Sequence, residues 1–243
     1  MAESITIPPP RRSSYRHLTH RPLNCLLFVL PLLGLFHIGS AFAQTTLLAS
    51  RHLERLLGVF GPTAGYLPPL LVVAALLLQH VAQRRTWRAQ GVVLAGMVIE
   101  SMLWAVSLYA VHYLCARLLH TTGVLAAGHG QTVFQKLLLA VGAGVYEEFI
   151  FRLIMVGLVT WTLHKVFGLK RDWGILLAIV AGALAFSLYH FSWTSPDVPF
   201  EWEPFVWRAA AGLCLGVIYA YRGFGIAVGT HALWNLYCVL ASA

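Results

Sequence analysis

The chain contains seven apolar runs, and their lengths restrict the folds that it can adopt. A helix rises about 1.5 Å per residue, so roughly 20 apolar residues cross the roughly 30 Å hydrocarbon core of a bilayer. Only 11% of the 243 residues are charged, whereas soluble domains carry about a quarter. We therefore predict an all-α polytopic membrane protein with about seven transmembrane helices. The runs lie near 25–43, 64–82, 91–114, 137–163, 174–191, 206–222 and 224–242.

The segments around these runs suggest three parts. Residues 1–22 are polar and basic and are expected to form a disordered arm. Residues 23–90 are expected to supply two transmembrane helices, and 91–243 the functional core. The first run ends in Ala41-Phe42-Ala43, which has the small-x-small form of a signal-peptidase site. A retained first helix is favoured over a cleaved signal because both the run and the arm before it are long.

Residues 45–58 are predicted to form an amphipathic helix that lies at the membrane surface. Their apolar side chains fall near one face of a helix and their charges elsewhere. The apolar positions are Leu48, Leu53, Leu56 and Leu57.

The basic residues indicate orientation rather than nucleic-acid binding. The net charge is +8, but the Lys and Arg residues lie in short loops between apolar runs and do not cluster as in a nucleic-acid module. With a cytoplasmic N-terminus, eleven of them lie inside and five outside, as the positive-inside rule requires. We expect an integral protein of the bacterial inner membrane, with membrane lipid as a partner and no nucleic acid.

Few ionisable residues lie within the apolar runs. An ionised side chain near the bilayer centre costs about 2.5–3.5 kcal/mol on insertion scales, so these residues need partners or a wet cavity. Glu148 and Arg152 are spaced i,i+4 and can pair, while Glu147 points about 100° away and stays available for chemistry. Glu100 lies about as far from the inner end of its predicted helix as Arg152 does from the inner end of its own, so Glu100 is a second candidate partner for Arg152. Other apolar runs contain two histidines and one asparagine: His190, His231 and Asn235.

Three spacings in these runs resemble the motifs of one protease family. Glu147-Glu148-x-x-x-Arg152, Phe186-x-x-x-His190 and His231-x-x-x-Asn235 are similar to the E-E-x-x-x-R, F-x-x-x-H and H-x-x-x-N/D motifs of the CPBP (CAAX protease and bacteriocin-processing) intramembrane proteases. That family includes the type II CAAX prenyl endopeptidase. The resemblance covers roughly residues 91–242, with the motifs in the family's order.

The resemblance implies a glutamate-dependent endopeptidase that cuts membrane-anchored proteins or peptides, prenylated or carrying a sorting tail. Glu147 would be the general base on a water, with His190 as its partner. His231 and Asn235 would donate hydrogen bonds to the oxyanion. The remaining motif residues, with Glu100, would support the site: Glu148, Arg152 and Phe186.

No metal is expected, because there is no H-E-x-x-H and an arginine lies near the acids. The alternative is a zinc ion held by Glu147, His190 and His231, a plausible His₂Glu ligand set.

Two other classes of function compete with a protease. A catalytically silent scaffold or immunity-type protein would tolerate loss of Glu147 or His190, yet both are present. A proton-coupled transporter would use the intramembrane glutamates, but no internal repeat is visible. With a cytoplasmic N-terminus the predicted site lies nearer the outer face, whereas the prenyl endopeptidases act on cytosolic substrates. Either the topology is inverted or tilted, or the site is reached from the outer side; in the second case we expect exported proteins with C-terminal sorting tails as substrates.

Two G-x-x-x-G spacings lie in the last two runs and predict close helix packing: Gly212–Gly216 and Gly225–Gly229.

Overall fold

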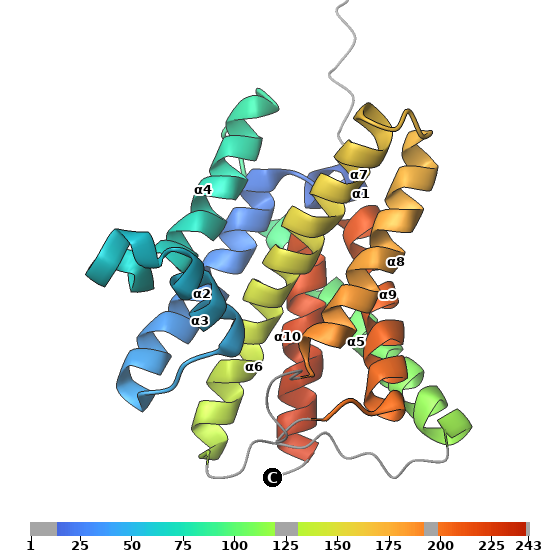
Figure 1. The fold of residues 1–243 in the computed structure, drawn as a ribbon. Coiled ribbons are helices and arrows are strands. Elements are labelled where there is room, and N and C mark those ends of the chain that lie inside the picture. Colours follow the sequence, from blue (N-terminus) through green and yellow to red (C-terminus); the bar gives the residue numbers. More distant parts are fainter. Residues whose placement is uncertain (1–13, 120–130, 192–198, 242–243) are drawn as a thin grey trace, which may run out of the picture.

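The computed structural model describes residues 14–119, 131–191 and 199–241, and every regular element in these ranges is helical (Figure 1). The all-α prediction is confirmed. The elements are α1 (Tyr15–Thr19), α2 (Pro22–Ala43), α3 (Leu48–Leu56), η1 (Gly58–Tyr66), α4 (Leu67–Ala82), α5 (Gly91–Leu119), α6 (Val133–Glu148), η2 (Phe149–Val156), α7 (Gly157–Lys165), α8 (Arg171–Tyr189), α9 (Trp202–Arg222) and α10 (Phe224–Ala241).

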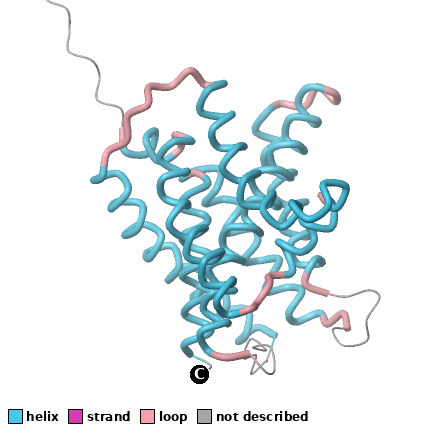
Figure 2. Tube along the Cα trace, turned by 90° about the vertical axis from the view of Figure 1, so that its left-hand side faces the viewer, coloured by secondary structure: helices cyan, strands magenta, loops and turns pink. Residues whose placement is uncertain are grey.

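Six helical segments of the described chain are long and apolar enough to cross a membrane. They are Pro22–Ala43, Gly58–Ala82, Gly91–Leu119, Arg171–Tyr189, Trp202–Arg222 and Phe224–Ala241. The long helices run alongside one another, and the loops gather at the two ends of the bundle (Figure 2). The protein is an integral membrane protein.

The seventh predicted span, 137–163, is helical throughout but not uniformly α-helical. α6, η2 and α7 follow one another without a break, so one helical rod runs from Val133 to Lys165 (Figure 1). The middle segment, η2, is π-helical, with i→i+5 hydrogen bonds and wider turns. Short π-helical segments occur frequently at functional sites, and this one begins directly after Glu148.

The rod begins at a capping box, which explains why a helix starts here. The Thr132 hydroxyl accepts from the Gln135 backbone N–H, and the Gln135 side chain accepts from the Thr132 N–H. The Gln135 amide also donates to the Ala43 carbonyl at 2.9 Å and so ties the rod to the end of α2.

Helix α10 lies inside the bundle and packs against α2, α5, α6 and α9 (Figure 1). The predicted close approach at the glycines is confirmed. A Cβ at Gly225 would lie 2.5 Å from Met97, and one at Gly229 would lie 2.4 Å from Ser101, both on α5. The Gly212–Gly216 spacing packs α9 against α8, since a Cβ at Gly216 would lie 2.7 Å from Ile179.

Helix α2 belongs to the same packed core. Phe36 occupies the space above Gly142 of α6, and Leu138 of α6 fills the space beside Gly39. Leucine and valine side chains of α2, α4 and α6 join one buried cluster with Phe224. Burial of this apolar surface stabilises the packing of α2 against the rod, which carries Glu147 and Glu148.

The disordered arm predicted for 1–22 needs correction in its second half; residues 1–13 lie outside the described residues. Tyr15–Thr19 form α1, and Pro22 already begins α2. Tyr15 packs over Gly96 of α5, and the Thr19 carbonyl lies beside Gly223. Gly223 has φ +97°, which favours glycine, and it links α9 to α10. A polar composition did not reveal this docking because the contacts come from distant segments.

The amphipathic helix predicted over 45–58 is present as α3, with a different buried face. Ala49, Ser50 and Leu53 are buried, whereas Leu48 and Leu56 are exposed. Exposed leucines on a short helix beside transmembrane spans are consistent with an interfacial position.

Candidate active site

Three helices bring one carboxylate and two imidazoles together. The Glu147 Oε2 atom lies 3.8 Å from His190 Nε2 and 3.7 Å from His231 Nε2. Glu147 comes from the rod, His190 follows the last residue of α8, and His231 lies on α10. Residues more than 40 positions apart in the sequence therefore meet around one acid, as the three motifs predict.

The second carboxylate, Glu148, is bonded on two sides. Its Oε1 atom lies 3.0 Å from Arg152 Nη1 and accepts a 2.8 Å hydrogen bond from His231 Nδ1. Glu148 is 0% and Arg152 1% exposed, so the predicted i,i+4 pair forms in a buried environment. Glu148 also orients the His231 ring, which directs Nε2 toward Glu147.

The Arg152 guanidinium has two further partners. Its Nη2 donates to the Gly212 carbonyl at 3.1 Å, and its Cζ lies 4.7 Å from the centre of the Phe186 ring. A Cβ at Gly212 would lie 3.0 Å from the Ala183 backbone. The glycine motif of α9 thus does more than pack helices, because it brings a carbonyl within reach of a buried cation.

Phe186 lies at the centre of the site. Its ring makes edge contacts with His190 at 4.9 Å, with His231 at 5.7 Å and with Phe151 at 5.5 Å between centroids. The Phe186 carbonyl accepts a 2.8 Å hydrogen bond from His190 Nδ1. Because a carbonyl only accepts, Nδ1 carries the hydrogen, and Nε2 of the neutral ring presents a lone pair toward Glu147.

Close contact between α6 and α10 makes this geometry feasible. A Cβ at Gly144 would lie 2.8 Å from the Ala232 backbone nitrogen, one residue after His231. Only glycine lets the two backbones approach so closely here. Asn235 follows His231 by one helical turn on α10 and is half-buried.

Glu100 is not part of this site, and its predicted contact with Arg152 is wrong. It accepts hydrogen bonds from Arg222 through both carboxylate oxygens and from Trp104 Nε1 at 3.2 Å. The prediction rested on the similar distances of Glu100 and Arg152 from the inner ends of their helices. Depth does not establish that two side chains face each other, and Glu100 faces α9 and α1 instead.

Sequence reasoning missed residues that surround the site. The Tyr189 hydroxyl lies 2.7 Å from His52 Nδ1, which joins α3 to the helix that carries His190. Burial, with Arg55 and Arg51 nearby, lowers the pKa of His52. Arg208 of α9 lies 5.3 Å from the Phe191 ring centre and interacts electrostatically with Glu147. A tyrosine next to the motif histidine was the only available sequence signal.

The alternative zinc ligands, Glu147, His190 and His231, meet around Glu147 Oε2. In the described part of the chain, no group of three or more His, Cys, Asp or Glu side chains could hold a metal ion. We derive no step through a metal.

A comparison with known protein families gives a match for part of the chain. Residues 129–237 match the family model described as type II CAAX prenyl endopeptidase Rce1-like. Comparison with curated proteins and with solved structures found no match. The matched residues include all three motifs and the helices that carry the site, and the family agrees with the resemblance read from the sequence. Residues 129–237 of this integral membrane protein are therefore similar to the type II CAAX prenyl endopeptidase Rce1-like family.

Proposed function

We propose that the protein is an intramembrane endopeptidase that hydrolyses a peptide bond with a water activated by Glu147. The observation that carries the proposal is the approach of Glu147 Oε2 to two imidazole Nε2 atoms within 3.8 Å. A carboxylate and a neutral imidazole nitrogen both accept hydrogen bonds, so together they can hold and orient one water between them.

The chemistry begins with proton transfer from this water to Glu147. The water oxygen attacks the carbonyl carbon of the scissile bond, and the carbonyl oxygen becomes an oxyanion. Donors aimed at that oxygen lower the barrier, and we assign this role to His231 and Asn235. Glu147 then delivers its proton to the leaving amine, which restores the carboxylate.

The buried pair of Glu148 and Arg152 supports this cycle by holding His231 in place. Glu148 fixes a hydrogen on His231 Nδ1. In the imidazolium form, Nε2 carries a second hydrogen that can point at the oxyanion. The net charge of the Glu147 and Glu148 carboxylates and the Arg152 guanidinium is −1. The imidazolium of His231 would balance this charge.

The surroundings of the site support a proposal for the substrate class. Glu147 is 7% exposed and lies in the middle of the helical rod, so the scissile bond must reach it from the membrane or its surface. We propose membrane-anchored proteins or peptides as substrates, in a bacterial inner membrane with the N-terminus in the cytoplasm. Proteins with C-terminal sorting tails fit a site that opens toward the outer face.

The test is cleavage of a panel of membrane-anchored peptides in proteoliposomes by the wild type and by Glu147→Gln. Loss of general-base catalysis costs about 10²–10⁴-fold in rate, and we expect a loss in this range. Glu203→Gln, an exposed acid on α9, is the matched control and should cleave at the wild-type rate. Undiminished cleavage by Glu147→Gln would overturn the mechanism.

The same assay distinguishes the glutamate mechanism from the zinc alternative. We expect EDTA and 1,10-phenanthroline to leave cleavage unchanged. Inhibition that added zinc reverses would instead assign Glu147, His190 and His231 to a metal.

A further inference from the structure

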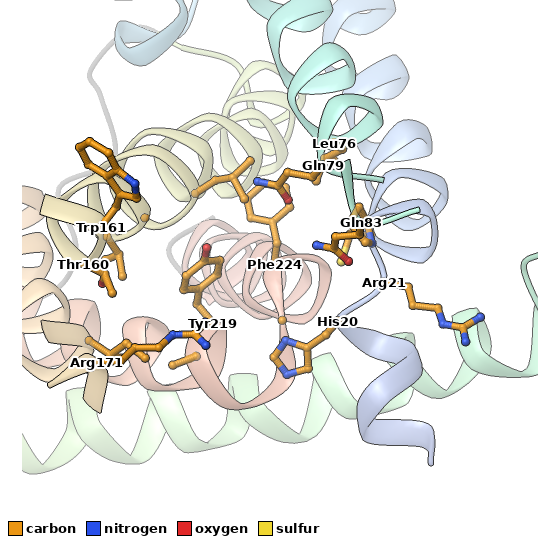
Figure 3. Close-up of a pocket in the computed structure, with 18 of the residues that line it drawn as sticks. His20, Arg21, Leu76, Gln79, Gln83, Thr160, Trp161, Arg171, Tyr219 and Phe224 are labelled. Carbon is orange, nitrogen blue, oxygen red and sulfur yellow. The ribbon is translucent and has the colours of Figure 1, made fainter. Parts of the chain in front are cut away.

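A separate cavity of about 800 Å³ lies at the end of the bundle that carries α1 and the start of α2 (Figure 3). Segments of α1, α2, α4, α7, α8, α9 and α10 surround it. Neither Glu147, His190 nor His231 lines it, so the proposed hydrolysis does not account for this cavity.

The polar side chains of this cavity carry positive charge. Arg21, Arg85, Lys165 and Arg171 line it, and they come from four different segments of the chain. No Asp or Glu is among the lining residues in the described part of the chain. Four cations around one space repel one another, and this arrangement favours an anionic occupant.

The inner wall of the cavity is apolar. Leu76 of α4, Leu153 and Val156 of the rod, Ile175 of α8 and Phe224 of α10 all line it. Figure 3 shows Phe224 near the middle of the lining residues, with Arg21 and Arg171 on opposite sides. The space therefore combines a cationic rim with a hydrocarbon wall.

Tryptophan side chains place this end of the bundle at the membrane surface. Trp161 lines the cavity and is 58% exposed, and Trp87 and Trp173 are 63% and 59% exposed on neighbouring segments. Exposed tryptophans concentrate at the headgroup level of bilayers. A cavity at this level is open to lipids.

We propose that this cavity binds an anionic phospholipid, with the phosphate at the basic rim and an acyl chain along the apolar wall. Basic pockets between transmembrane helices bind anionic headgroups in this way, and guanidinium groups form charge-assisted hydrogen bonds to phosphate oxygens. Free phosphate shares the rim chemistry but makes no use of the apolar wall.

The test is binding of fluorescent phosphatidylglycerol to the delipidated full-length protein in neutral detergent. Competitors are unlabelled phosphatidylglycerol, phosphatidylcholine and sodium phosphate. The probe variant is Arg85→Gln/Arg171→Gln, and the matched control is Arg84→Gln/Lys170→Gln. The control residues adjoin the probe residues, are equally basic and exposed, and do not line the cavity. A third variant, Gly157→Leu, places apolar bulk in the cavity, and a Cβ there meets no atom within 4 Å.

We expect Arg85→Gln/Arg171→Gln to weaken phosphatidylglycerol binding about tenfold or more, since each basic residue near an anionic lipid contributes about 1 kcal/mol. The control pair should change it less than about twofold, and Gly157→Leu should also reduce it. Equal weakening by both charge pairs would show only general surface attraction and would overturn the proposal. Equal competition by phosphatidylcholine, or by phosphate as strongly as by the lipid, would overturn it too.

Discussion

Two ion pairs in this protein use the same residue types in different ways. Glu148 and Arg152 lie one turn apart on the same rod and are 0% and 1% exposed. Glu100 and Arg222 join α5 to α9 by two hydrogen bonds and keep 16% and 19% of their side-chain surface exposed. The second pair fastens the end of α9 to α5, while the first is buried beside another carboxylate and orients a histidine.

The difference shows how burial separates a bracing pair from a pair in a site. A buried ion pair is weak evidence for stability, because desolvation offsets much of the attraction. Burying Glu148 and Arg152 next to a second acid, Glu147, is costly, and the arrangement is best understood through the chemistry it permits. Glu100 and Arg222 need no such explanation, since solvent and Trp104 share the charge.

The largest expected effect is on the buried pair. Arg152→Met leaves Glu148 buried without its cation, and we expect the free energy of unfolding to fall by about 3–5 kcal/mol, with loss of cleavage. Reversible SDS unfolding in mixed micelles measures the change. Glu148→Leu/Arg152→Met removes both charges and should cost less than the sum of the single changes. Additive losses would show that the two side chains do not act as a pair.

The contact between α6 and α10 comes next. Gly144→Ala places a methyl group against the Ala232 backbone and should cost about 1–3 kcal/mol, because the helices must separate. Cleavage should fall too, since His231 moves with α10. Gly34→Ala on α2 is the matched control, because a Cβ there meets nothing within 4 Å. Thermal unfolding and cleavage rates that are equal for the two variants would contradict this account.

The bracing pair should respond weakly. Glu100→Gln keeps the size of the side chain and removes one charge from a partly exposed pair, and such pairs contribute about 1 kcal/mol or less. We expect a small loss of stability in SDS unfolding and a cleavage rate within about twofold of the wild type. A loss of cleavage comparable with that of Glu147→Gln would return Glu100 to the site.

The smallest effect concerns Tyr15, which contacts the bracing pair. Burial, with a hydrogen bond to Glu100, raises the pKa of Tyr15 to about 12. A raised pKa means that the folded state favours the protonated phenol, so its contribution is present below pH 10 and is lost as the pH rises toward 12. The melting temperature should fall more between pH 9 and pH 11.5 for the wild type than for Tyr15→Phe. Parallel falls would exclude this role for Tyr15.

The sequence predicts much of the site because of helix geometry. The i,i+4 spacing of Glu148 and Arg152 specifies the pair before any fold is known. The separation of Glu147 from that pair follows from the 100° turn per residue. The meeting of Glu147 with His190 and His231 was implied by a family resemblance, since no local rule relates residues on three helices.

Other features could not be read from one sequence. The π-helical segment after Glu148 has no compositional signal, and the docking of α1 depends on glycines in α5 and in the turn before α10. The partner of Glu100 was wrong because rotation about a helix axis is set by packing rather than by depth. The contact of Tyr189 with His52 joins segments 137 residues apart.

The sequence by itself determined that this chain lies in a membrane, that it is all-helical and which acids and histidines lie within its spans. Those properties depend on hydrophobicity and on the helical period, which act over a few turns. Only the tertiary structure decided that Arg222 and not Arg152 pairs with Glu100, that Arg152 reaches a carbonyl of α9, and that four basic side chains surround one cavity. Such contacts depend on how helices rotate and approach, and that is settled by the packing of the whole bundle.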